Sequence, residues 1–162
     1  MPKPLAVVPD LEAELDGLYA LAPADFVDAR DDLARRLKQA GQSDAAGQVK
    51  GLRKPTVPVW VVNTLARTQP HEIQTLLAAG ARLRTAQERA LAGGTDELRA
   101  ATAEERAALG VLTRQADVLL SAEGHGTGAA TLERVATTLR AAARDPAGRD
   151  LLTAGRLTEE LA

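Results

Sequence analysis

The sequence contains no cysteine and only three aromatic residues, Tyr19, Phe26 and Trp60. Without cysteine there are no disulfides, no thiolate nucleophile and no zinc site built on sulfur. With so few aromatics, the interior must be built from leucine, valine and alanine, and a base-stacking platform for single strands is disfavoured. No apolar run approaches the roughly 20 residues of a membrane span, and MPKPLAVVPD is too short and proline-rich for a secretory leader. These absences predict a soluble, cytoplasmic protein.

The remaining composition is typical of α-helical proteins. Alanine, leucine, arginine and glutamate dominate, and the 162 residues are 45% apolar and 26% charged, enough for one ordinary core. We therefore predict an all-α protein with an extended arm over residues 1–9, a single helical domain over 10–154 and a tail over 155–162. Two packed subdomains are the alternative.

Prolines, glycines and capping residues divide the chain into predicted helices. The second of these is expected to bury Phe26, Val27, Leu33, Ala34, Leu37 and the stem of Arg30. The short break at Gly93-Gly94 predicts a long antiparallel hairpin over about residues 70–123. Ahead of the helices, only 5–8 has the composition of a short strand. The predicted helices cover about residues 10–21, 23–40, 43–53, 56–68, 70–91, 95–123, 127–144 and 145–154.

The segment 56–68 is ambiguous because the β-branched run 57–62 is also typical of a buried strand. Pro58 would remove a hydrogen-bond donor from a strand, but it fits the first turn of a helix that starts after Thr56. We therefore predict a helix. Its apolar residues continue almost all the way round, so it should be the buried central element of a multi-helix bundle on which the hairpin packs.

Charge is unevenly distributed along the chain. The formal net charge is −2, yet residues 33–68 carry seven basic residues and one acid, Asp44, whereas the rest carries 13 basic and 21 acidic residues. This excess predicts a basic face if the fold brings the side chains together. The seven are Arg35, Arg36, Lys38, Lys50, Arg53, Lys54 and Arg67.

The same region contains a block that combines cations with the only tryptophan. If Thr56 caps a helix, then Trp60, Asn63 and Arg67 follow at spacings of four, three and four residues and share one edge. A helix N-terminus with nearby cations suits an anion such as a phosphate. The structural alternative is that Trp60 is a core anchor and that Asn63 binds a neighbouring backbone group.

Three stretches carry a resemblance to a known family: LYALAPADFVDARDDLARRLKQAG, VKGLRKPTVPVWVVNTLAR and LLTAGRLTEEL. The chain resembles an uncharacterised family of alanine- and arginine-rich helical proteins from high-GC bacteria, over about residues 18–161. The most specific part is LRKPT-x3-W-x2-N, at residues 52–63. The resemblance implies an all-helical fold, and it brings no established activity that could be carried over to this chain.

The sequence offers several candidate catalytic or metal-binding residues, but none of them forms a convincing motif. His71 and His125 lack the glutamate spacing of di-iron bundles, and HExxH is missing. The turn around His125, EGHGTG, lacks the preceding strand and following lysine of a phosphate loop. Asp117, Ser121 and His125 recur at spacings of four, but spacing alone supplies no triad geometry. We therefore predict no catalytic residues, no metal, no cofactor and no enzymatic activity.

Adjacent acids do not share a helical face, because neighbouring residues diverge by about 100°. They are interpreted as solvated surface. These pairs are Asp31-Asp32, Glu104-Glu105 and Glu159-Glu160.

Two functional hypotheses remain. The first is a nucleic-acid-binding protein whose seven cations contact the phosphate backbone of DNA with weak sequence preference, with Thr56, Trp60 and Asn63 as anchors. The second is a helical interaction or self-assembly module, such as a homodimer, that docks through the alanine-rich hairpin. Neither hypothesis involves a membrane.

Overall fold

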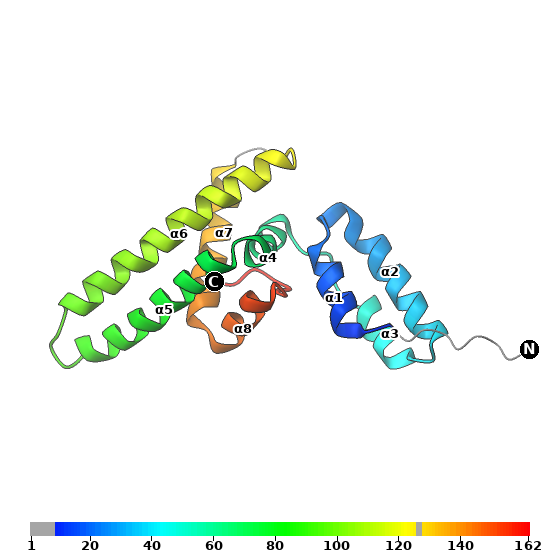
Figure 1. Cartoon of the computed structure of the whole chain (residues 1–162), viewed down its shortest axis with the longest axis horizontal. Coiled ribbons are helices and arrows are strands. Elements are labelled where there is room, and N and C mark those ends of the chain that lie inside the picture. The colour runs from blue at the N-terminus through cyan, green and yellow to red at the C-terminus, as the bar shows by residue number, and fades with distance from the viewer. Residues whose placement is uncertain (1–8, 126–127) are drawn as a thin grey trace, which may run out of the picture. The chain divides into compact units, whose positions relative to one another are not determined.

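The protein is entirely helical in the part of the chain that the computed structural model describes, residues 9–125 and 128–162. Eight helices and no strands occur there, which confirms the all-α prediction (Figure 1). The predicted strand at 5–8 and the predicted helix start at Thr127 lie outside the described residues. The helices are α1 (Leu11–Ala20), α2 (Pro23–Gln39), α3 (Ser43–Lys50), α4 (Val57–Thr68), α5 (Pro70–Ala90), α6 (Asp96–Ala122), α7 (Ala129–Arg144) and α8 (Pro146–Ala154).

The chain divides into two compact units, Met1–Pro55 and Thr56–Ala162, called here the N-terminal and C-terminal units. Each has its own apolar contacts. No described helix combines the length and the apolar composition that crossing a lipid bilayer would require.

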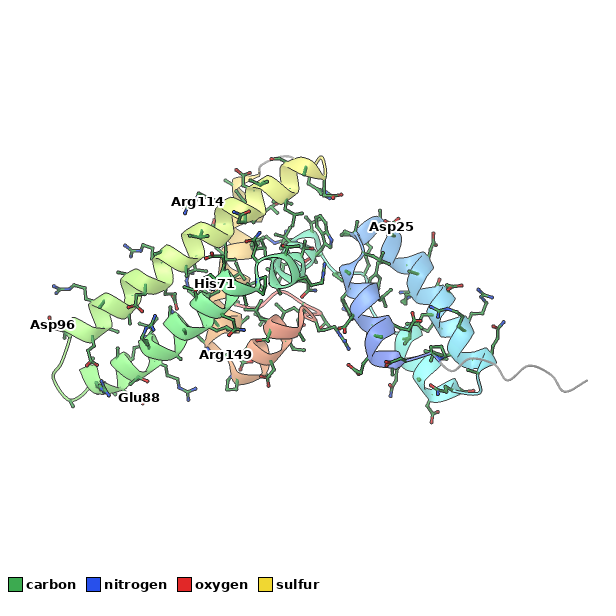
Figure 2. The ribbon with its side chains drawn as sticks, in the orientation of Figure 1. Asp25, His71, Glu88, Asp96, Arg114 and Arg149 are labelled. Carbon is green, nitrogen blue, oxygen red and sulfur yellow. The ribbon has the colours of Figure 1, made fainter. Side chains whose placement is uncertain are left out.

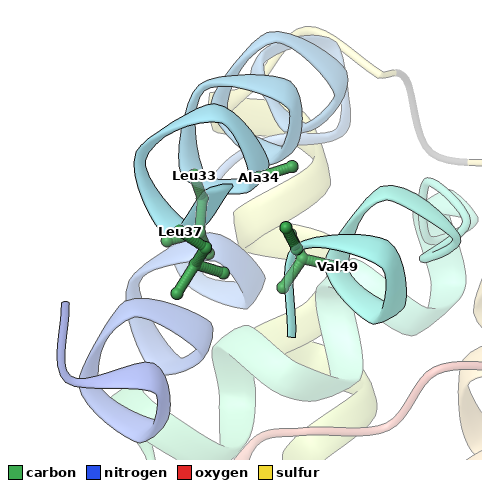
Figure 3. Packing of buried hydrophobic residues seen from close by; sticks show 5 residues of the cluster. Leu33, Ala34, Leu37 and Val49 are labelled. Carbon is green, nitrogen blue, oxygen red and sulfur yellow. The ribbon is translucent and has the colours of Figure 1, made fainter. Parts of the chain in front are cut away.

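In the N-terminal unit, α2 and α3 pack side by side. Leu33, Ala34 and Leu37 of α2 contact Ala46 and Val49 of α3, and all five are buried (Figure 3). The spacing of three and four residues places these side chains on one face of each helix. The two helices therefore form a small hairpin.

The first helix completes this unit through aromatic packing. Tyr19 of α1 and Phe26 of α2 lie with ring centroids 5.7 Å apart, and both are buried. The predicted burial of Val27 is wrong, because this side chain is 37% exposed. Phe26 takes the inward position, and Val27, about 100° further round the helix, faces outward. The third helix is also shorter than predicted: it ends at Lys50 rather than near Arg53, since Gly51 and the proline at 55 disfavour helix beyond it.

The C-terminal unit is built around α4, as predicted. The hydroxyl of Thr56 accepts a hydrogen bond from the amide of Val59 at 3.4 Å, and Pro58 lies in the first turn. Val59, Val61 and Val62 are fully buried. The ambiguous segment is therefore a helix, and its β-branched side chains fill the core rather than a sheet.

Helices α5 and α6 form the predicted antiparallel hairpin, packed with α7 and with α4 and α8 (Figure 1). Glu88 and Asp96 lie toward the end of the hairpin, which extends beyond the other helices of this unit (Figure 2). Near that end the contact between the two helices consists of Leu83, Ala86 and Ala101, with Leu98 at its edge. This half of the hairpin is thus held by its own two helices.

Candidate functional site

Three of the seven predicted cations line one hollow in the N-terminal unit. Arg35 and Lys38 approach it from α2 and Lys50 from α3, and its volume is about 550 Å³. Its wall on α2 uses positions 31, 34, 35 and 38, and its wall on α3 uses 43, 46, 47 and 50. Each set has the spacing of one helical face, so the pairing of α2 with α3 brings the cations together. Ala34 and Ala46 supply apolar contacts between the charged edges.

Two aspartates balance part of this charge. Asp31 lies 2.9 Å from the ammonium of Lys50, and its pKa is lowered chiefly by that hydrogen bond and then by the one from Arg30. Asp32 pairs with Arg35, and this contact is the largest cause of the lowered pKa of Asp32. All these side chains are substantially exposed except Arg30. Ion pairs in such positions are screened by water and contribute little to stability.

Arg36 has a different environment from Arg35. Its guanidinium binds Glu14 of α1 through two hydrogen bonds of 2.8 and 3.0 Å, and its Nε donates to Asp32 at 3.0 Å. The hydrogen bonds to Glu14 raise the pKa of Arg36, and the same contact lowers the pKa of Glu14. Bidentate pairing fixes the guanidinium in place. Arg36 therefore joins α1 to α2 and is the least accessible of the six predicted cations in the N-terminal unit.

Lys38, Arg53 and Lys54 are exposed. Within the described residues, none of the three has a carboxylate oxygen within 4 Å of its charged group. Arg53 and Lys54 follow α3 by three and four residues, so they continue the basic stretch that begins at Lys50.

The seventh cation, Arg67, belongs to the C-terminal unit. It lies near the end of α4, where its guanidinium donates to the hydroxyl of Thr64 at 3.1 Å, and its stem lies beside Gly155. Trp60 is in the same helix and is only 5% exposed, with its ring centroid 5.8 Å from that of His125. The indole is thus mainly a packing group in the C-terminal unit, whereas six of the seven cations belong to the N-terminal unit.

Asn63 forms a buried polar contact in this unit. Its side-chain nitrogen donates to the carbonyl oxygen of Leu157 at 2.9 Å, and its side-chain oxygen accepts from the amide of Leu157 at 2.9 Å. Asn63 is fully buried and Leu157 is 1% exposed. This geometry matches the structural alternative, in which Asn63 binds a neighbouring backbone group. It holds the C-terminal tail against α4.

A carboxylate of the protein itself lies at the start of α4. Glu160 accepts a hydrogen bond from the hydroxyl of Thr56 at 3.0 Å, and Arg134 of α7 donates to it through Nε at 2.6 Å and through a terminal nitrogen at 2.5 Å. The hydrogen bond from Arg134 is the main cause of the lowered pKa of Glu160. The prediction that Glu160 is simply solvated is therefore wrong. The position that the sequence suggested for a bound anion contains the Glu160 carboxylate.

Replacing Glu160 with glutamine should reduce the amount of stability that the C-terminal unit loses as the pH falls. The folded pKa of Glu160 is lowered, so its ionised form stabilises the fold. This contribution is complete above the usual value of 4.5 and is lost as the pH falls through the lower folded value. Urea unfolding followed by Trp60 fluorescence measures this effect. Between about pH 5.5 and 3.5, the urea concentration at the unfolding midpoint should fall less for E160Q than for the native chain.

The neighbouring substitution Glu159→Gln is the matched control, because Glu159 is exposed and has no such contact in the described residues. It should leave the acid profile unchanged. Equal flattening by both substitutions would show that the Glu160 contacts do not stabilise the folded state.

Glu105 is a second correction to the prediction of solvated acids. It is 5% exposed on α6 and binds Arg144 of α7 at 2.7 Å, with Arg140 at 3.7 Å. A buried carboxylate needs such partners, because leaving it unpaired would be costly. The spacing of Arg140 and Arg144 is a signal in the sequence for one basic helical face, but it does not identify the acid that lies opposite.

No gathering of three or more metal-ligating side chains occurs among the described residues. In comparisons with known proteins, no protein-family model, curated protein or solved structure matches the chain. The family resemblance therefore stays a prediction.

Proposed function

We propose that this protein binds nucleic acid with weak sequence preference, through phosphate contacts made by the cations of its N-terminal unit. The observation that carries the proposal is the convergence of Arg35, Lys38 and Lys50 on one hollow between α2 and α3. Phosphate groups attract such cations through charge alone, and bound counterions are released when they pair. Backbone contacts of this kind position a protein without reading bases.

The ion pairs that these cations form are compatible with this role. Lys38 has no carboxylate partner among the described residues, and the pairs of Arg35 and Lys50 are exposed. Exposed pairs are weak, so exchanging an aspartate for a phosphate costs little. Arg53 and Lys54 extend the charge beyond the C-terminal end of α3. Arg36 contributes less, because both terminal nitrogens of its guanidinium donate hydrogen bonds to the carboxylate of Glu14.

The test is a fluorescence-anisotropy titration of the full chain with labelled duplex and single-stranded DNA. We expect binding at low salt that weakens steeply as salt rises, with a slope of log affinity against log salt near the number of phosphates contacted. The double substitution Lys38→Glu and Lys54→Glu should lower the affinity at low salt by about tenfold or more and reduce the slope by about 2.

The control makes the same charge change elsewhere. Arg99 and Arg106 of α6 are exposed and, like Lys38, have no carboxylate partner in the described part of the chain. Changing both to glutamate should alter the affinity far less. If neither probe binds the native chain at low salt, or if the two double variants lose affinity equally, this function is excluded.

A further inference from the structure

The far half of the α5–α6 hairpin has a groove on one face. The groove has a volume of about 450 Å³, and all its lining residues come from α5 and α6. Ala86 and Ala101 form a buried floor, and Ala81, Thr85 and Ala100 stand at the surface around them. These side chains are short, so a helix can approach the groove closely.

Charged side chains border the groove in an ordered way. Arg82 and Arg89 lie on its α5 side, and Glu97 and Glu104 lie on its α6 side. Arg82 pairs with Glu104 at 2.6 Å and Arg89 with Glu97 at 2.9 Å, so each pair crosses from one helix to the other. The two arginines are seven positions apart on α5, and the two glutamates are seven positions apart on α6, about 10 Å along each helix axis. The groove therefore has one basic edge and one acidic edge at matching levels.

An occupant that fits this groove must supply acidic groups above α5 and basic groups above α6, at two levels seven residues apart. The same face of a second chain supplies this pattern. If the copies are related by a two-fold axis parallel to the hairpin, α5 of each copy lies over α6 of the other. Each arginine then faces the partner's glutamate at the same level, and the small residues of the two floors meet.

We propose that this face binds a second copy of the chain and forms an antiparallel four-helix bundle from two hairpins. A two-fold interface uses the same patch on both copies, so the patch has to be self-complementary, as this one is. The perpendicular two-fold axis would place α5 over α5 and α6 over α6, which opposes like charges. Charge thus selects one arrangement, and alanine side chains allow the helices to pack closely.

This inference goes beyond nucleic-acid binding and rests on other residues. It involves the C-terminal unit alone, whereas the proposed phosphate contacts lie in the N-terminal unit. Either proposal can fail without affecting the other.

The first test is sedimentation of the full chain at about 100 μM, a concentration at which a micromolar dimer is mostly assembled. We expect twice the mass of one chain for the native protein and the mass of one chain for Ala100→Glu. Ala100 is exposed in the groove wall, so the substitution blocks the face while leaving both intramolecular ion pairs in place. The matched control is Thr102→Glu, exposed about 160° round the same helix from Ala100, which should remain a dimer.

The second test exchanges charge. A chain with Glu97→Arg and Glu104→Arg has two basic edges, and a chain with Arg82→Glu and Arg89→Glu has two acidic edges. Each alone should sediment as a monomer, and an equimolar mixture should form a mixed dimer, because only the mixture opposes unlike charges. Circular dichroism of each variant checks that it is helical. A monomeric native chain, a dimer that persists in Ala100→Glu, or a mixture of folded variants that stays monomeric would overturn the proposal.

Discussion

An alanine at position 63 should lower the free energy of unfolding of the C-terminal unit by about 3 kcal/mol, because the side chain of Asn63 supplies both hydrogen bonds to the backbone of Leu157. Alanine would leave a buried amide and a buried carbonyl unpaired. Each such group costs about 1–3 kcal/mol when no water replaces the lost partner. Leu157 itself is 1% exposed, so access for water requires the tail to move away from α4.

Urea unfolding followed by the fluorescence of Trp60 measures this effect, since the single tryptophan lies in α4 and reports on the C-terminal unit. Gln74→Ala is the control: it also removes an amide side chain, but from an exposed position on α5. It should shift stability by less than about 0.5 kcal/mol. A loss for Asn63→Ala no larger than that of the control would mean that the hydrogen bonds to Leu157 contribute nothing.

The second large effect concerns two glycines within helices that should respond to alanine in opposite directions. A β-carbon at Gly80 of α5 would stand 2.9 Å from the carbonyl oxygen of Ala143 in α7, closer than such atoms approach. The obstacle is backbone, so the two helices would have to move apart. We expect Gly80→Ala to destabilise the unit by about 1–3 kcal/mol, despite the gain in helix propensity.

Gly110 of α6 provides the matched control. The nearest atom that its β-carbon would meet is a terminal nitrogen of Arg114 at 3.6 Å, at the end of a flexible side chain. Alanine there should stabilise the unit by about 0.5–1 kcal/mol through helix propensity. The same fluorescence-detected unfolding measures both variants. Stabilisation by Gly80→Ala would show that α5 and α7 are not in close contact at this point.

Local signals were sufficient to predict most helix boundaries. Thr56 with Pro58 begins α4, and Gly93 lies in the turn that separates α5 from α6. Such boundaries are predictable because caps, prolines and glycines act on the backbone within one turn. Two errors in the predicted helices have local causes. Val27 faces outward because Phe26 takes the contact with Tyr19, and α3 ends early at Gly51.

The candidate site was only partly predictable. The spacing of Arg35 and Lys38 already places them on one helical face, and the pairing of α2 with α3 adds Lys50. Nothing in the local sequence indicates that Glu14, 22 residues away, holds Arg36. Nor does it indicate that Arg67 and Trp60 belong to a different compact unit from the other cations.

The sequence by itself determined the helical class and the order of the helices, because propensity, capping and periodicity depend on residues within a few positions of each other. The tertiary structure decided which charges are neutralised and which acids are buried. The contact between Thr56 and Glu160 spans 104 positions, and that between Asn63 and Leu157 spans 94. Pairings of this kind depend on how the helices pack, and helical periodicity carries no information about which faces will meet.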